Sequence, residues 1–175
     1  MLILQESKVS SLLVDKDAIY SAEGNASVTS RNLVIGQNVA YAGEYGISTD
    51  PESFAVNGYR KYFTDRDQNV VCRLSMDGIT PISSYGMTDF FRDKLSAATG
   101  NIIGGWDAHN KQYVLSIPQN GVIGGIGVVE AYETLEFDET SQGWVSLFDY
   151  KPNQIFSLKN DSVTIKYGKL YKQYK

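Results

Sequence analysis

The sequence predicts a mainly β protein made of antiparallel hairpins, and its composition and its turn pattern support this class. The 175 residues include 12 Tyr, 7 Phe and 2 Trp, and 16 Gly accompany only 4 Pro. Aromatic residues favour strands, and glycine favours the tight turns that join them. A chain of this length forms one domain, or one with a small appendage, and can bury a core without disulfides or metal.

The first 35 residues are expected to differ from the rest. Short apolar runs at 11–14 and 32–35 lie among Ser, Asn, Asp and Gly with little periodicity. Residues 1–35 are therefore predicted to form an extended N-terminal arm or partial strands. Residues 36–175 are predicted to form an antiparallel β domain with hairpins at 59–83, 101–117, 132–150 and 155–174.

A three-strand meander is predicted over residues 59–83. Its strands are placed at 59–64, 70–75 and 79–82, after a loop at 43–54 that contains the turn-forming Asp50-Pro51. Asp77-Gly78 between apolar runs is a strong hairpin signal, because glycine adopts the positive φ that such a turn requires.

One short helix is predicted at about 88–98. Thr88 is the expected N-cap, Asp89 lies in the first turn and Gly100 follows the end. Phe91 and Leu95 are four residues apart and therefore share one face.

The later hairpins suggest a repeat. The turns at Asp65 and Asp107 are 42 residues apart, which is typical of four-stranded β-propeller blades. Residues 132–174 are expected to form one complete blade, reached through a glycine-rich link at 121–127. About three blades cannot close a ring, because four to eight are typical. The chain is therefore expected to be part of something larger or to close by oligomerising.

Charge and hydropathy exclude several classes of protein. A net charge of −4 and a pI near 5.0 provide no basic field that would concentrate nucleic acid. Met1–Glu6 lacks a basic region, so no secretory signal peptide is expected. The longest uncharged stretch, 113–129, contains Pro118 and several glycines, and no membrane span is expected.

Candidate sites for metal or catalysis each have a simpler structural interpretation. Residues 65–69 place oxygen ligands at alternate positions, but Val70 and Met76 stand where a calcium loop needs glycine and glutamate, so an Asx-rich turn is favoured. His109 is the only histidine and lies in a turn, which argues against a Ser-His-Asp triad or a histidine-rich metal site. The 121–127 link lacks the Gly-x-Gly-x-x-Gly order of a nucleotide loop.

Acidic pairs, the cysteine and the aromatic residues are assigned in the same way. The pairs Glu133/Glu136 and Asp89/Asp93 are predicted to face solvent. Cys72 is predicted to be a buried, reduced thiol. Large aromatic residues divide into an expected core set and an expected exposed set. The core set is Phe63, Trp106, Trp144 and Phe148, and the exposed set is Tyr167, Tyr171 and Tyr174. The sequence therefore predicts no catalytic, cofactor-binding or metal-binding residues.

Several stretches over residues 25–175 share their order and spacing with one group of proteins. They are Tyr45-Gly-Ile-Ser-Thr-Asp-Pro-Glu-Ser-Phe-Ala55, 62–65, 73–83, 86–87, Ile103-Gly-Gly-Trp-Asp107 and Gly143-Trp-Val-Ser-Leu-Phe-Asp-Tyr150. These stretches resemble large virion structural proteins of tailed bacteriophages, notably crAss-like phages of gut bacteria and related marine phages. The resemblance implies a piece of a much longer tail or nozzle-type protein, and it carries no catalytic signature.

The resemblance implies a non-enzymatic structural component of a virion that acts through rigid shape and protein–protein interfaces. Expected partners are other virion and tail proteins and further copies of the chain, with passive contact to packaged DNA, no membrane and no cofactor. The expected location is the virion, after synthesis in the host cytoplasm.

The first alternative is a carbohydrate- or receptor-binding module that uses exposed aromatics such as Tyr171 and Tyr174. The second is a glycoside hydrolase-like enzyme, which needs two carboxylates roughly 5–10 Å apart in one cleft.

Overall fold

The computed structural model describes residues 1–20, 26–122, 128–148 and 150–174, and within them the chain is mainly β. The strands form four antiparallel sheets in which neighbours in sequence are neighbours in space. The predicted mainly β class with antiparallel hairpins is confirmed.

The first sheet contains β1 (Leu2–Leu4), β2 (Val9–Tyr20) and β3 (Ala26–Ala40). The second contains β4 (Ala55–Asn57), β5 (Arg60–Asp65), β6 (Val70–Ser75) and β7 (Gly78–Pro81). The third contains β8 (Ile103–Asp107), β9 (Gln112–Val122), β10 (Val128–Asp138) and β11 (Gly143–Phe148). The fourth contains β12 (Gln154–Leu158), β13 (Asp161–Lys166) and β14 (Lys169–Lys172).

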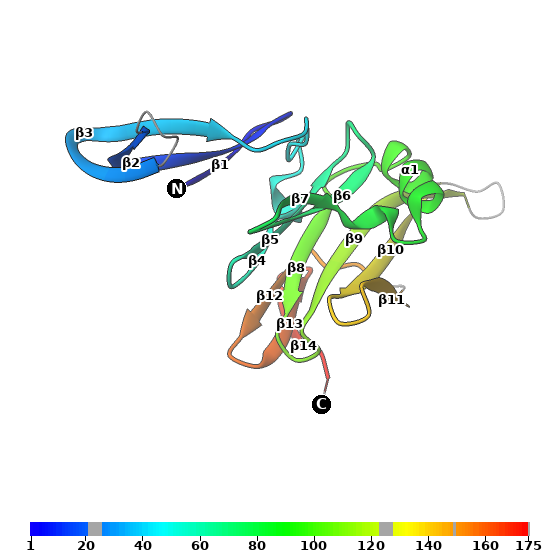
Figure 1. Ribbon diagram of the computed structural model, residues 1–175. Helices are drawn as coiled ribbons and strands as arrows, with labels where there is room; N and C mark the ends of the chain where they lie inside the picture. The colour runs from blue at the N-terminus through cyan, green and yellow to red at the C-terminus, as the bar shows by residue number, and fades with distance from the viewer. Residues whose placement is uncertain (21–25, 123–127, 149, 175) are drawn as a thin grey trace.

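The first sheet, called the arm below (residues 2–40), projects from the body formed by the other three sheets (Figure 1). Its base is fixed by backbone hydrogen bonds: the N–H groups of Ile47 and Ser48 donate to the carbonyl oxygens of Gln5 and Glu6, both at 2.9 Å. A Cβ atom at Gly46 would lie 2.1 Å from the Glu6 carbonyl oxygen, so the close approach of the two chains requires glycine.

Two apolar cores lie on opposite faces of the β4–β7 sheet, as the alternation of a strand requires. Phe63 and Cys72 face the arm base and pack with Val9. Tyr62, the neighbour of Phe63, faces the β8–β11 sheet and joins the larger core. Partners in the larger core include Tyr113, Leu115, Ile117, Leu135 and Phe137.

The helix α1 (Thr88–Ser96) forms close to its predicted position. Phe91 and Leu95 are both fully buried in the larger core, which confirms the predicted shared face. The predicted N-cap is wrong: Met87 is the cap residue, Thr88 is the first helical residue, and no side chain bonds to the helix end. Two short 3₁₀ helices, η1 (Pro51–Ser53) and η2 (Ile82–Ser84), complete the body.

The predicted blade over residues 132–174 is wrong, because β10 and β11 belong to one sheet and β12–β14 to another. The two turns 42 residues apart are not equivalent, since one follows the second strand of its sheet and the other follows the first strand of the next. The body sheets begin at residues 55, 103 and 154. A likeness of these sheets to propeller blades stays a prediction, as does the division of the chain at residue 35.

The glycine-rich link at 121–127 was expected to join separate sheets. Instead β9 and β10 pair continuously from Val122↔Val128 to Gln112↔Asp138, so the segment connects two strands of one sheet. Residues 123–127 themselves lie outside the described part of the chain. The pairing explains why β9 and β10 are longer than predicted.

Candidate interaction surfaces

The arm exposes apolar side chains along a long ribbon. At roughly 3.3 Å per residue, a strand of 12 residues such as β2 spans about 40 Å. Val14 and Ile35 are cross-strand partners and so lie on one face, and both are exposed, Ile35 to 66%. The adjacent Val34 is equally exposed on the other face, and Val28 lies farther out, also exposed. Apolar residues at the base of the arm, Val9 and Leu12, are buried, whereas Val14, Val28, Val34 and Ile35 farther along it are exposed.

The β12–β14 sheet has one face toward the body and one toward solvent. Ile155 lies on the body side, since a Cβ atom at Gly105 in β8 would come within 2.5 Å of its side chain. Strand alternation then places a second set on the opposite side, called the outer face below. The outer face includes Phe156, Leu158, Val163, Ile165, Leu170 and Lys172, and of these Val163 is buried. Leu158 and Leu170 are 58% and 67% exposed, so among the described residues nothing covers them.

Lysines concentrate at this end of the molecule. Residues 151–175 contain six lysines and one acid, for a net charge of +5, whereas residues 1–150 contain ten basic and nineteen acidic residues, for −9. Lys166 and Lys169 lie directly opposite each other across the β13–β14 hairpin, beside the exposed Tyr167. Lys172 pairs with Asp161 at 2.8 Å. A chain with an acidic total thus carries one basic end.

The side of the β8–β11 sheet that faces β12–β14 buries polar groups. The Tyr174 hydroxyl donates to Glu136 Oε1 at 3.0 Å, and the Tyr174 ring stacks on His109. Burial raises the pKa of Glu136; the Tyr174 hydrogen bond opposes this shift, and the charge of Asp107 adds to it. The prediction that Glu136 faces solvent is wrong, because its side chain is 2% exposed beneath the C-terminal segment.

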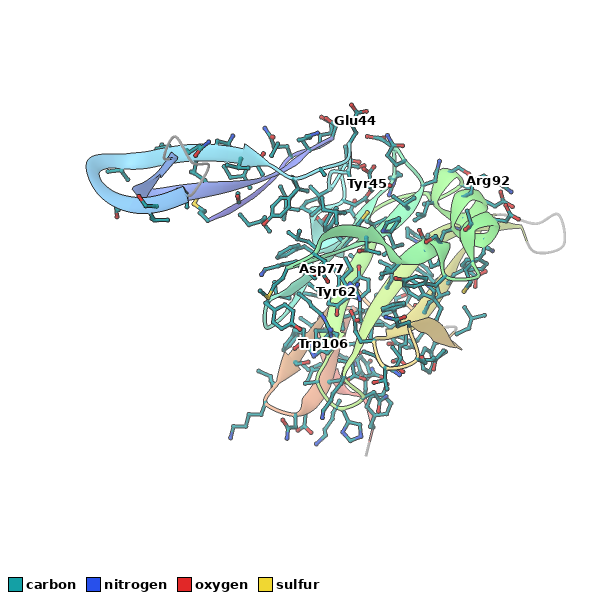
Figure 2. The ribbon with its side chains drawn as sticks, viewed as in Figure 1. Glu44, Tyr45, Tyr62, Asp77, Arg92 and Trp106 are labelled. Atoms are coloured by element: carbon teal, nitrogen blue, oxygen red, sulfur yellow. The ribbon has the colours of Figure 1, made fainter. Side chains whose placement is uncertain are left out.

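The other acids of the predicted pairs lie at the surface or in ion pairs. Glu133 binds the Lys94 ammonium at 2.6 Å and is partly covered. Asp89 and Asp93 are exposed and both contact Arg92, as predicted for a solvated helix face, and Arg92 is labelled in Figure 2. None of these acids is brought together with Glu136 into one site.

The Asp65 turn uses its oxygen atoms to hold the preceding loop. Asp65 Oδ2 accepts from the Gly46 N–H at 2.8 Å, and Oδ1 accepts from the Ser48 hydroxyl at 2.9 Å and from the Gln68 N–H at 3.0 Å. A second acid, Asp50, accepts from the Arg66 guanidinium at 2.7 Å. The turn therefore fixes the segment that joins arm and body, and no cluster of three or more metal-ligating side chains occurs among the described residues.

Two small cavities lie beside Ile103 of β8. One of about 450 Å³ is lined by Phe54, Gly104 and Ile155, with Glu52 at its edge. Another of about 270 Å³ is lined by Tyr132, Asn101, Asn153 and Lys151. The Lys151 ammonium lies 4.3 Å from the Tyr132 ring centroid. Neither cavity contains a pair of carboxylates.

The predictions for the aromatic residues are confirmed in part. Phe63 is fully buried, and Tyr167, Tyr171 and Tyr174 are exposed to different degrees. Trp106 is half-buried and stacks on Tyr62 at 5.6 Å where β5 meets β8 (Figure 2).

Trp144, Phe148 and Cys72 were also predicted to be buried. Trp144 is half-buried against the larger core, with its indole N–H donating to the Ile82 carbonyl oxygen at 3.1 Å. The prediction that Phe148 belongs to the core is wrong, because its side chain is only half-buried and contacts the Tyr150 ring. Cys72 is buried, as predicted, and burial raises the pKa of its thiol.

Neither of these exposed surfaces is predicted by the sequence pattern. The run Asn32–Ile35 signalled an apolar segment in the arm, but not that its side chains would remain exposed. The net charge of the whole chain is negative and does not reveal the basic end. A separate count of the charges in the last 25 residues would have identified it.

No protein-family model and no curated protein matches this chain. Within the described residues, no helix is both long and apolar enough to cross a membrane.

Proposed function

We propose that this chain is a non-enzymatic structural component of a tailed-bacteriophage virion, part of the tail or nozzle assembly, that acts through rigid shape and protein–protein interfaces. The observation that carries the proposal is the projecting arm with uncovered apolar side chains such as Val34 and Ile35. Beyond β1 the arm has only two strands, and a two-stranded hairpin alone is only marginally stable in water, so a partner surface would stabilise it. The resemblance of residues 25–175 to virion structural proteins supports the same role.

The body supports the structural role by being tightly interlocked. Glu139, in the turn after β10, accepts a hydrogen bond from the Tyr62 hydroxyl at 2.6 Å and pairs with Arg73 at 2.7 Å. These contacts tie the β8–β11 sheet to the β4–β7 sheet across a largely buried site. A rigid body of this kind holds its interfaces at fixed positions relative to each other, which a structural component of a virion requires.

Mass spectrometry of density-gradient-purified particles, from infected cultures of the phage that encodes the chain, tests the proposal. Peptides from residues 59–83 should be found with the particles at a fixed ratio to capsid proteins and should survive a high-salt wash. Peptides found only in the soluble lysate would contradict a virion role.

A carbohydrate-binding module is the second candidate, favoured by the exposed rings of Tyr167 and Tyr171 near the β13–β14 hairpin. Tyr174 is less suited, because its hydroxyl already donates to Glu136. Glycan-array binding that is lost in Tyr171→Ala and retained in Tyr59→Ala, an exposed tyrosine elsewhere, would favour this function over a purely structural one.

A further inference from the structure

Positive and negative charge are separated along this chain. Residues 151–175 contain six lysines and one acid, for +5, and residues 41–150 contain fifteen acidic and seven basic residues, for −8. The arm is nearly neutral, since residues 1–40 contain four acids and three bases. The β13–β14 hairpin lies at the end of the body away from the arm (Figure 1). Salt screens exposed charges beyond about 8 Å, so the lysines of this hairpin act on whatever lies next to them.

Two lysines face each other at the end of the β13–β14 hairpin. Lys166 and Lys169 are directly opposite across the two strands, on either side of the turn at Tyr167. Like charges in this position destabilise a hairpin. Asp161, the single acid of residues 151–175, lies five residues from Lys166, about 17 Å along an extended strand, and pairs with Lys172 at 2.8 Å. Among the described residues, neither Lys166 nor Lys169 forms an ion pair.

Exposed tyrosines lie beside these two lysines. Tyr167 is 77% exposed, and the Lys166 ammonium lies 5.6 Å from its ring centroid. Tyr171 is 45% exposed and lies on the same face as Lys166 and Lys169, as the alternation of the strands requires. Lysines that contact phosphates and rings that stack on unpaired bases are the two parts of a surface for single-stranded nucleic acid.

The segment before β12 holds the end of the hairpin in place. The Asn153 N–H donates to the Ile165 carbonyl oxygen at 2.7 Å, and Asn153 Oδ1 accepts from the Tyr167 N–H at 2.9 Å. A third cation, Lys151, lies two residues before Asn153, with its ammonium 4.3 Å from the Tyr132 ring centroid. The lysines and rings at this end are therefore positioned before any ligand binds, which lowers the entropic cost of binding.

A nucleic acid fits this surface better than the acids of a second copy do. Several acids of residues 41–150 are already neutralised or buried: Asp50 pairs with Arg66, Glu139 pairs with Arg73, and Glu136 is 2% exposed. An acidic protein surface would also leave the rings of Tyr167 and Tyr171 without a stacking partner.

We propose that the β13–β14 hairpin binds single-stranded nucleic acid, with Lys166 and Lys169 on backbone phosphates and the rings of Tyr167 and Tyr171 stacked on bases. Binding is weak, independent of sequence and sensitive to salt, because few phosphate contacts are made. This inference goes beyond the structural role proposed above and does not depend on it. A chain that is found in particles but binds no strand would keep that role and lose only this activity.

The test is fluorescence anisotropy of labelled oligo(dT) and of a labelled duplex, titrated with the 175-residue chain at several salt concentrations. The chain should bind oligo(dT) more tightly than the duplex, whose bases are not accessible to the rings. The logarithm of the binding constant should fall with the logarithm of the salt concentration with a slope of about −2, for three lysines at about −0.7 each.

A pair of matched variants locates the phosphate contacts. Lys166→Gln/Lys169→Gln should bind more weakly and reduce the size of the salt slope by about 1.4. Lys8→Gln/Lys61→Gln makes the same change in net charge at lysines outside this end and should bind as the wild type does. Removing the repulsion between Lys166 and Lys169 should not destabilise the hairpin, and thermal unfolding followed by circular dichroism checks this.

A second pair of variants tests the stacking. Tyr167→Ala should weaken binding to oligo(dT) by about fivefold or more without changing the salt slope, whereas Tyr59→Ala should have no effect. No binding to oligo(dT) at about 50 mM salt, equal affinity for the duplex, or full binding by the lysine variant would overturn the proposal. Self-association that is lost in the lysine variant, without binding to oligo(dT), would identify an acidic protein surface as the partner and would also overturn it.

Discussion

Along β9, both faces of the β8–β11 sheet are buried, and they differ in chemistry. The face toward the β4–β7 sheet is apolar and includes the cross-strand pair Leu115 and Leu135. The face toward the β12–β14 sheet includes the neighbouring pair Ser116 and Thr134, whose hydroxyls lie 2.9 Å apart, and Glu136. The β8–β11 sheet therefore contacts the β4–β7 sheet through apolar packing and the β12–β14 side through polar groups.

The apolar face stabilises the fold through burial, and the polar face positions a neighbour through directional bonds. The Thr134 hydroxyl donates to the Tyr150 carbonyl oxygen at 2.7 Å, which fixes the chain as it leaves β11. Buried polar groups stabilise little in net terms but cost much when left unpaired. Substitutions on the two faces should accordingly differ in size and in pH dependence.

The largest effect is expected on the apolar face. Phe137→Ala should reduce the free energy of unfolding by about 3–5 kcal/mol, because it leaves a cavity beside Trp144 and Tyr85. Urea unfolding followed by tryptophan fluorescence measures the loss. Leu147→Ala, at an exposed site, should change the free energy by less than about 0.5 kcal/mol. Equal losses in the two variants would contradict the comparison.

A smaller effect is expected where β8 meets β12. The new methyl group of Gly105→Ala would lie 2.5 Å from the Ile155 side chain, and we expect a loss of about 1–3 kcal/mol. Gly143→Ala is the control, since its nearest neighbour would be 3.9 Å away. The same urea titration checks both, and a neutral Gly105→Ala would mean that the two sheets separate at little cost.

The polar face should respond to pH. The pKa of Glu136 is raised above its ordinary value of 4.5, so the folded state keeps a proton that the unfolded state has lost. The contribution of Glu136 to stability is therefore fully present below about pH 4.5 and is lost as the pH rises through the folded pKa. Glu136→Gln cannot ionise, so its stability relative to the wild type should increase from acidic to neutral pH.

Urea midpoints measured at several pH values check this prediction. Burial also raises the pKa of Asp50, but that carboxyl is present in both proteins and cancels in the difference. Parallel pH profiles for the two proteins would show that the carboxyl of Glu136 is not desolvated.

The smallest effect is expected on the solvent side of the β12–β14 sheet. Lys172→Ala removes an exposed ion pair with Asp161 and should change the free energy of unfolding by about 0–1 kcal/mol. A double-mutant cycle with Asp161→Ala measures the pair itself. A coupling well above 1 kcal/mol would make this surface pair equal to the buried bonds on the other side of the sheet.

Local signals made most of the hairpins predictable. Asp77-Gly78 specified its turn, and the four-residue spacing of Phe91 and Leu95 specified the buried face of α1. The burial of Glu136 could not be predicted, because the alternation of β10 is the same whether its polar face meets water or protein. Its cover, Tyr174, comes from 38 residues away in sequence. The exposure of the apolar side chains of the arm was unpredictable for a related reason, since it depends on where the arm points relative to the body.

The burial of Cys72 has a practical consequence. It is the sole cysteine of the chain, and burial raises its pKa, so little reactive thiolate is available at neutral pH. A cysteine introduced on the arm would then be the one site that takes up a maleimide fluorophore or crosslinker. The wild-type background is therefore already suited to site-specific labelling.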